Sequence, residues 1–364
     1  MHGPRRPRTD RPASGRGTAA NPAGRFASER VVPVDDGWTP SDAPAPPIRT
    51  QLTPERSRSI ITTNDSPDVP FSRSINPYKG CEHGCVYCFA RPTHAYLDLS
   101  PGLDFESRIV YKPDAARLLE RALRKPGYRP EPIALGANTD PYQPAERELR
   151  ITRALLEVLA AYAHPVGVVT KSNLILRDTD LLADLARRGL AHALISITTL
   201  DRDLARRLEP RAPTPDRRLD AVRALADAGV PVGVLVSPII PAINDGEIEA
   251  ILEAAAAAGA RAAGTILVRL PHELKDLFEG WLDDHYPLRK PRVLARIRDA
   301  RGGRLYDSRW GTRMRGVGPY ADLLRRRFDV AARRLGLDRE LPPLDAGQFR
   351  VPPRAGDQLA LFDG

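Results

Sequence analysis

Cysteine is scarce in this chain of 364 residues, which has only three. Long apolar runs are missing as well: no stretch of about 18 apolar residues occurs, so we expect no transmembrane helix. The arginine-rich beginning, MHGPRRPRTDRPASGRG, is followed by no apolar segment, which argues against a secretory or twin-arginine signal. These absences predict a cytoplasmic protein whose thiols stay reduced.

The three cysteines are gathered in one run, INPYKGCEHGCVYCFARPTHAYL, with the spacing CxxxCxxC. They are Cys81, Cys85 and Cys88. Structural thiols would be scattered through a core, so this cluster indicates chemistry. A zinc site would need His83 or His94 as its fourth ligand, because no second CxxC pair exists. The spacing, with Tyr87 before the last cysteine, fits better an iron-sulfur cube held by three thiolates with one iron open; an unliganded loop is the other alternative.

Short apolar runs alternate with helical patterns over the middle of the chain. The runs that we expect to be strands are 71–76, 132–138, 166–172, 192–199, 231–238 and 264–270. Helices are expected over 115–125, 146–163, 178–189, 214–229 and 245–259. This alternation predicts an α/β fold with a parallel sheet and right-handed crossovers, a pattern that an open sheet and a barrel share.

Composition divides the chain into four regions. Residues 1–50 are rich in Pro, Gly, Ala and Arg and have no apolar periodicity, which predicts disorder. The α/β region is expected over 51–285, and a basic helical extension over 286–340. Residues 341–364 begin with irregular, proline-rich sequence, which predicts a linker to the C-terminus.

Polar residues follow several expected strands at their carboxyl ends, where ligands bind in parallel α/β architectures. The candidates for ligand contact are Gly136, Asn138, Thr139, Asp140, Lys171, Ser172, Ser196 and Thr198. Turns and helix caps use the same residue types, which is the alternative at each position. Asn244 and Asp245 precede an expected helix and are better explained as caps.

Together these segments resemble the spore photoproduct lyase-like branch of the radical SAM superfamily over about residues 70–300. The matching segments are the cysteine run, GANTDPYQPAE, TKS, SITT and LEPRAPTPDRRLDAVRALADAGV. The resemblance implies a partial (β/α)6 barrel whose first strand runs into the cysteine loop. It also implies that the cysteines hold a 4Fe-4S cluster and that S-adenosyl-L-methionine is cleaved to a 5'-deoxyadenosyl radical. A flavodoxin- or ferredoxin-type protein would donate the electron.

The same resemblance assigns the surroundings of the cofactor. Residues 136–140 would contact the methionine amino group, and Ser172, Ser196 and Thr198 would lie near the ribose or the carboxylate. Further cofactor-binding candidates are Tyr87, Lys171 and, as a partner of the carboxylate, Arg211.

One departure from the family concerns the hydrogen donor. The lyase uses an additional cysteine outside the cluster to return a hydrogen atom to the product radical, and this chain has no fourth cysteine. Lyase chemistry on spore DNA is therefore in doubt. Tyr142 and Tyr96 are the candidates to donate the hydrogen atom instead.

The net charge of +9 is concentrated toward the C-terminus, where residues 301–336 hold ten arginines and three aspartates. Guanidinium groups pair with phosphates, and aromatic rings stack on bases, so this composition predicts nucleic-acid binding. The expected contact residues are Arg304, Arg309, Trp310, Arg313, Arg315, Arg325, Arg326 and Arg327. The alternative is a solvated, arginine-rich helix surface.

The last residues, DQLALFDG, contain a second recognisable motif. Gln358, Leu359, Leu361 and Phe362 match QLxLF, the peptide by which many bacterial replication and repair proteins dock on the DNA sliding clamp. A terminal segment packed on the chain's own core is the alternative. The position at a free end after a proline-rich linker favours the peptide.

These features predict a radical SAM enzyme that acts on DNA, in repair or base modification, and is recruited through the sliding clamp. Two alternatives remain open. One is radical modification of RNA or protein; the other is a non-catalytic DNA-binding protein whose cluster or zinc is structural.

Overall fold

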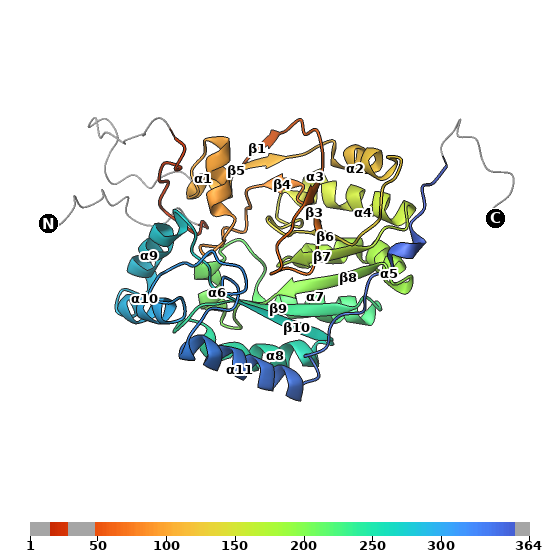
Figure 1. Cartoon of the computed structure of the whole chain (residues 1–364). Helices are drawn as coiled ribbons and strands as arrows, with labels where there is room; N and C mark the ends of the chain where they lie inside the picture. Colours follow the sequence, from red (N-terminus) through yellow and green to blue (C-terminus); the bar gives the residue numbers. More distant parts are fainter. Residues whose placement is uncertain (1–14, 28–47, 354–364) are drawn as a thin grey trace.

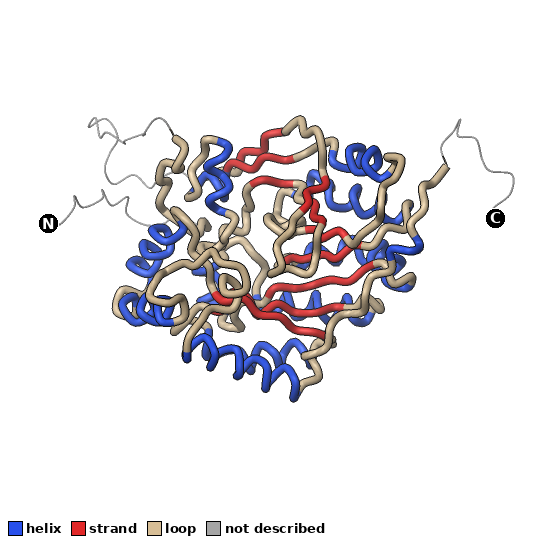
Figure 2. Tube along the Cα trace, in the orientation of Figure 1, coloured by secondary structure: helices blue, strands red, loops and turns tan. Residues whose placement is uncertain are grey.

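The computed structural model describes residues 15–27 and 48–353. Its larger sheet has seven strands in the order β10-β9-β8-β7-β6-β3-β2 (Figures 1 and 2). They are β2 (Ile61–Thr63), β3 (Arg73–Ile75), β6 (Ile133–Leu135), β7 (Val166–Thr170), β8 (Ala191–Ser196), β9 (Val232–Ile239) and β10 (Ala262–Leu267). From β3 to β10 every neighbouring pair is parallel, and β2 is antiparallel at the edge. Six parallel strands in sequential order confirm the predicted partial (β/α)6 barrel.

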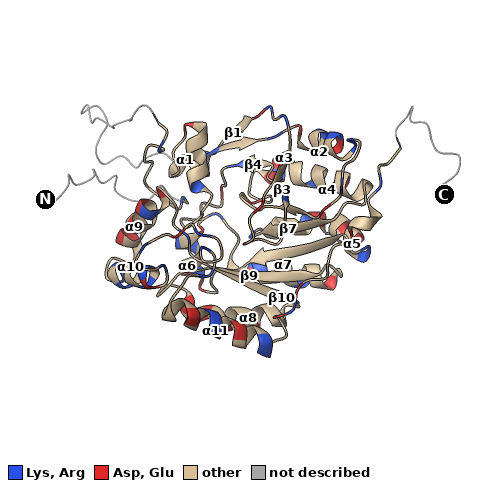
Figure 3. Ribbon diagram, viewed as in Figure 1, with Lys and Arg blue, Asp and Glu red and all other residues tan. Residues whose placement is uncertain are grey.

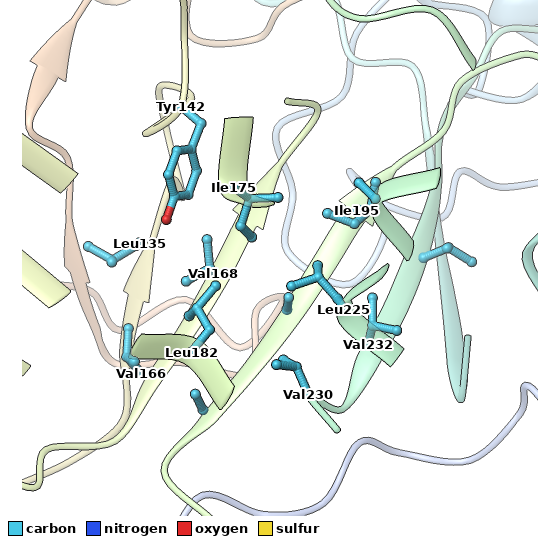
Figure 4. Close-up of a cluster of buried hydrophobic side chains, with 14 of the residues drawn as sticks. Leu135, Tyr142, Val166, Val168, Ile175, Leu182, Ile195, Leu225, Val230 and Val232 are labelled. Atoms are coloured by element: carbon cyan, nitrogen blue, oxygen red, sulfur yellow. The ribbon is translucent and has the colours of Figure 1, made fainter. Parts of the chain in front are cut away.

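Helices connect the parallel strands and bury the outer face of the sheet. The connecting helices are α2 (Ala115–Leu123), α3 (Glu146–Leu149), α4 (Ile151–Ala161), η2 (Asn173–Asp178), α5 (Thr179–Arg187), α6 (Arg202–Leu208), α7 (Pro215–Asp227), η3 (Asp245–Glu247) and α8 (Ile248–Ala257). Figure 4 shows Val166 and Val168 of β7 among Leu182 of α5 and Leu225 of α7. Strands covered in this way read as continuous apolar runs, which is why the sequence predicted them.

A smaller sheet flanks the barrel where the cysteine loop begins. It has the order β1-β5-β4, with β1 (Gln51–Pro54), β4 (Tyr78–Lys79) and β5 (Arg108–Tyr111). The turns η1 (Arg91–Leu97) and α1 (Leu103–Ser107) lie between β4 and β5. Sequence analysis did not predict this sheet, because strands of two to four residues are too short to show a period.

The expected helix over 146–163 is wrong in one respect, because it divides into α3 and α4. Arg150 lies between them with a φ of +49°, in the left-handed region. The amide of Thr152 donates to both carboxylate oxygens of Glu146 at 3.1 Å, which caps the new helix with a buried charge. This helix start joins residues six positions apart, so no helical period reveals it.

Residues 15–27 correct the prediction of disorder over 1–50. Arg16 is buried and donates to the carbonyl oxygens of Glu106 and Ile48, both at 2.7 Å. The amide of Gly17 donates to the Glu106 carboxylate at 2.8 Å. We call residues 15–27 the strap. It packs on the cysteine loop through Gly17, where a Cβ atom would lie 1.8 Å from the carbonyl oxygen of Gly84.

The expected basic extension is helical, but it belongs to the same core as the barrel. It includes α9 (Leu274–His285), α10 (Lys290–Asp299), α11 (Pro319–Arg334) and the short η4 (Ala346–Gln348). Helix α11 lies along α8 (Figure 1), and its Leu324 and Phe328 join the main hydrophobic cluster. Across the ranges that the structure describes, no helix has the length and apolar character needed to span a membrane.

Candidate active site at the cysteine loop

The cysteine loop follows β4 and is held by backbone hydrogen bonds. The amide of Cys81 donates to the carbonyl oxygen of Phe105 at 2.9 Å, and the amide of Val86 donates to that of Leu208 at 3.0 Å. Cys81 and Cys85 are each only 7% exposed, and Cys88 is half-buried. The loop thus presents three thiols from a fixed backbone.

Arg91, which sequence analysis did not select, is the centre of this fixation. Its guanidinium donates to the carbonyl oxygen of Cys85 at 2.8 Å and to that of Gly84 at 3.0 Å. It also donates to the carbonyl oxygens of Pro101 and Gly102 and forms an ion pair with Glu106. Arg91 and Glu106 are both completely buried. A charge buried this deeply is stable only with partners, and here the partners shape the loop.

The end of β6 meets the cysteine loop at Asp140. Its carboxylate accepts from the Thr170 hydroxyl at 2.6 Å and from the Lys171 amide at 2.8 Å. Nδ1 of His83, in the cysteine loop, lies 3.3 Å from the same carboxylate. Burial alone would raise the pKa of Asp140, but His83 and the hydrogen bonds lower it to about 2. Asp140 is therefore a permanent anion that joins two strand ends to the loop.

A second buried acid, Glu209, was also missed by sequence analysis. The hydroxyls of Tyr87 and Thr198 both donate to its carboxylate, the latter at 2.7 Å. Arg218 of α7 forms an ion pair with it. Burial raises the pKa of Glu209, but the charges of Arg218 and Lys171 outweigh burial and lower the pKa to about 2. Tyr87 and Thr198 are thus occupied by the protein and position the loop.

Lys171 places a cation beside the thiols. Its ammonium group lies 5.8 Å from the centroid of the Tyr87 ring. Burial lowers the pKa of Lys171, but Cys85 and Glu209 raise it more, so the ammonium group stays charged. Burial also raises the pKa of Cys85 to about 12 and that of Cys81 well above its ordinary value. In the protein alone these thiols are neutral, and only a bound metal group would hold them as thiolates.

The arrangement fits an iron-sulfur cluster better than a single metal ion. Within the part of the chain that the structure describes, no three His, Cys, Asp or Glu side chains converge as ligands of one ion. A cluster takes each thiolate on a separate iron atom. Cys81 interacts electrostatically with both Cys85 and Cys88, so the three thiols share one site. The nearby Lys171 would offset part of the negative charge of such a cluster.

The other strand-end residues are divided between ligand-ready and structural positions. Gly136 has a φ of +87°, and a Cβ there would lie 2.2 Å from the carbonyl oxygen of Val169, so it serves close backbone approach. The amide of Asn138 donates to Asn76, and the Thr139 hydroxyl donates to the carbonyl oxygen of Tyr78. These contacts favour the structural alternative. Ser172 likewise caps η2 by accepting from the Leu174 amide.

Two further predictions are affected by the observed contacts. The guanidinium of Arg211 lies 3.2 Å from the carboxylate of Glu82, so its charge is paired inside the protein. Ser196 is buried at the end of β8, and among the described residues its hydroxyl has no hydrogen-bond partner. Of the predicted hydroxyls, that of Ser196 is the one left available to a ligand.

The two candidate hydrogen donors are not placed with the thiols, which corrects that prediction. Tyr142 is completely buried, points into the core (Figure 4), and donates to Asp178 at 3.0 Å. Tyr96 is 71% exposed, and its ring centroid lies 5.2 Å from that of Phe26 in the strap. Both tyrosines occur near the motif in sequence, but their side chains leave it in other directions.

The basic segment differs in its two halves. On α11 positive and negative side chains alternate (Figure 3): Arg325 pairs with Asp322, and Arg327 with Glu249 of α8. This pairing favours the alternative of a solvated helix surface for α11, although Arg326 is exposed. In the loop before α11, Arg309 pairs with Asp307 and Arg313 with Asp68, whereas Arg304, Arg315 and Trp310 are exposed. The predicted peptide Gln358 to Phe362 lies outside the described residues.

Comparison with known proteins agrees with this geometry. An uncharacterized protein of Mycobacterium tuberculosis is 33% identical over 351 residues, covering 91% of this chain and 99% of that protein. One of Methanocaldococcus jannaschii is 29% identical over 173 residues, covering 48% of this chain and 62% of that protein. A spore photoproduct lyase mutant shares the fold, with a TM-score of 0.56 at 18% identity and coverage of 78% of both chains. The lyase complexed with dinucleoside spore photoproduct gives 0.54 at 19% identity and the same coverage.

The family itself follows from the sequence match. The model of the radical SAM superfamily matches residues 75–255, which span β3 to α8 and include the cysteine loop. The loop, the parallel barrel and this match agree in position, and the chain belongs to the radical SAM superfamily.

Proposed function

We propose that the protein binds a 4Fe-4S cluster through Cys81, Cys85 and Cys88 and reductively cleaves S-adenosyl-L-methionine. The superfamily implies an iron-sulfur cluster and S-adenosylmethionine as cofactors, and it supports enzymatic activity. One observation carries the proposal: the cysteine loop contacts the carboxyl ends of successive parallel strands, where Asp140 and Lys171 meet it. Cofactor sites occur at that end of such sheets.

The residues of the chain would bind and orient the cofactor. When bound, the reduced cluster supplies one electron to the sulfonium of S-adenosylmethionine, which leaves methionine and a 5'-deoxyadenosyl radical. Lys171 holds a positive charge beside Cys85, and Ser196 offers a hydroxyl at the end of β8. The buried Arg91 and Glu209 keep the loop in place and exclude water from its rear side.

We further propose that the substrate is a nucleic acid, with DNA as the first candidate, in repair or base modification. Arg304, Arg315 and Trp310 are exposed in the loop before α11, which supports binding of phosphates and bases. The shared fold with spore photoproduct lyase, which is known in complex with a dinucleoside spore photoproduct, also supports this choice. A cytoplasmic location and a flavodoxin- or ferredoxin-type electron donor complete the proposal.

Anaerobic reconstitution tests the cofactor part. We expect about four iron atoms per chain and formation of 5'-deoxyadenosine from S-adenosylmethionine and dithionite. Alanine at Cys81, Cys85 or Cys88 should reduce 5'-deoxyadenosine to background, whereas the exposed Ser59→Ala control should not. Full activity of an iron-free, zinc-loaded sample would contradict the proposal.

The substrate part needs a separate measurement. Product formation should be compared with single-stranded DNA, duplex DNA, ultraviolet-irradiated DNA and RNA of the same sequence, and the nucleosides analysed by mass spectrometry. A modified deoxynucleoside that depends on S-adenosylmethionine would support DNA. A modified ribonucleoside alone would assign the enzyme to RNA, and no nucleic-acid product would direct the search to proteins.

A further inference from the structure

Arg269 differs from the buried arginines of this protein because it has no acceptor. Arg91 and Arg218 each form an ion pair with a buried glutamate, and Arg301 donates to four carbonyl oxygens. Arg269 is half-buried, yet among the described residues no carboxylate or carbonyl oxygen accepts a hydrogen bond from its guanidinium. A guanidinium has five donors, and leaving them unused away from water is costly.

The side chain lies at the cysteine loop. Arg269 follows β10 by two residues, and its guanidinium carbon lies 4.1 Å from the ring centroid of Phe89. Phe89 comes directly after Cys88 and is 41% exposed, which leaves part of its ring open. Arg301 donates to the carbonyl oxygens of Leu267 and Val268 at 3.1 and 2.7 Å, which fixes the backbone that carries Arg269.

Positive charge is in excess around Arg269. Arg301 and Arg313 lie close enough to interact with it, and the negative charge nearby comes from Asp68 and Asp307. Asp68 is already paired with Arg313, at the edge of the loop before α11. Burial lowers the pKa of Arg269, and Arg313 adds to this effect. The surroundings therefore favour an external anion.

The lysine on the other side of the cysteine loop provides the contrast. Lys171 follows β7, interacts with Cys85, and is compensated by Glu209 and Asp140. Arg269 follows β10, interacts with Cys88, and continues into the loop that exposes Trp310. Lys171 thus belongs to the internal network of the cofactor site, whereas Arg269 faces the exposed basic loop.

We propose that Arg269 and Phe89 form a substrate subsite, in which the guanidinium binds a phosphodiester group of a nucleic-acid strand beside Cys88. The planar fork of arginine matches two phosphate oxygens, and the open face of Phe89 accepts a neighbouring base by stacking. The subsite positions the strand next to the reacting centre. This inference rests on the proposed nucleic-acid substrate and identifies the residue that holds it.

The first test measures binding of a fluorescent single-stranded dT12 to the full, cluster-loaded chain by anisotropy, across a salt series. Arg269→Gln should lower the affinity about tenfold, as expected for loss of a charge-assisted hydrogen bond. It should also reduce the salt slope by about 0.7, the value for one phosphate of a single strand. Arg269→Lys keeps the charge and should retain the slope with a smaller loss of affinity.

The matched control is Arg223→Gln, since Arg223 of α7 is an exposed arginine paired with Asp220. If Arg269→Gln binds dT12 as the control does, with the same salt slope, the subsite is refuted. Weaker S-adenosylmethionine binding in equilibrium dialysis, with dT12 binding unchanged, would assign Arg269 to the cofactor and also refute it. Tighter binding of a poly-glutamate peptide than of dT12 would overturn the phosphodiester assignment.

A second probe separates this inference from the proposed function. Inorganic pyrophosphate, titrated calorimetrically, should bind the parent chain and should bind Arg269→Gln at least about tenfold more weakly. If no oligonucleotide binds but this difference is seen, the nucleic-acid substrate fails and the anion subsite stands. If oligonucleotides bind but neither probe distinguishes Arg269→Gln or Arg269→Lys from the parent, the subsite fails and the proposed function stands.

Discussion

The buried ion pair of Arg91 and Glu106 gives the sharpest prediction about stability. Both side chains are 0% exposed, and Arg91 also donates to four carbonyl oxygens. Removing one partner of a buried pair leaves an uncompensated charge, which typically costs about 3–5 kcal/mol. Glu106 would keep the hydrogen bond from the Gly17 amide, so we expect Arg91→Leu to cost about 4 kcal/mol rather than more. Total stabilities are commonly about 5–15 kcal/mol.

Urea unfolding of the cluster-free protein, followed by circular dichroism, measures this cost. With m-values of roughly 3 kcal/mol/M or more for a chain of this size, the midpoint should fall by about 1 M. The control is Arg223→Leu, which breaks an exposed pair and should cost less than about 1 kcal/mol. The double variant Arg91→Leu with Glu106→Leu removes both charges, so it should be less destabilised than the sum of the single variants.

Two results would refute this reasoning. A loss below about 1 kcal/mol for Arg91→Leu would mean that water reaches the Glu106 carboxylate. Strict additivity in the double variant would mean that the two charges do not interact. The single variant should also retain less iron after reconstitution, because the carbonyl oxygens of Gly84 and Cys85 lose their donor.

Three further predictions concern other parts of the chain. Gly17→Ala should displace the strap and speed tryptic cleavage at Arg16, whereas Gly246→Ala, where a Cβ meets nothing within 4 Å, should not; equal cleavage rates would argue against strap docking. Burial lowers the pKa of His164 to about 4 from 6.5, so its contribution to stability is lost as the pH falls from about 6.5 to 4. His164→Gln should flatten the dependence of the urea midpoint on pH in that window, and an unchanged slope would contradict this. Alanine at Leu361 and Phe362 together should abolish sliding-clamp pull-down without affecting cluster content, and undiminished binding would exclude the peptide.

The sheet was predictable from the sequence because its strands are buried on both faces. Apolar, β-branched residues run through β7, β8 and β9, and no other structure buries such short runs so completely. The exceptions were segments in which tertiary contacts outweigh local pattern. The helix over 146–163 shows an unbroken apolar period, yet the buried carboxylate of Glu146 caps a second helix within it.

The candidate site was predictable where chemistry depends on residue type, and not where it depends on a distant partner. Three cysteines in an otherwise cysteine-free chain identify themselves. Glu209 does not, because the hydroxyl of Tyr87 that it accepts from is 122 positions away. The same limit explains α11: a run of arginines shows charge, but not that Arg327 meets Glu249 of α8.

The strap shows why composition failed at the N-terminal end. Low hydrophobicity predicts disorder because such a segment has little apolar surface to bury. In residues 15–27 the contact is made instead by the backbone of Gly17 and the side chain of Arg16, both bonded to Glu106. A glycine allows this approach because it has no side chain, and glycine is also what lowers the hydrophobicity. The residues that suggested disorder are thus those that dock the strap on the cysteine loop.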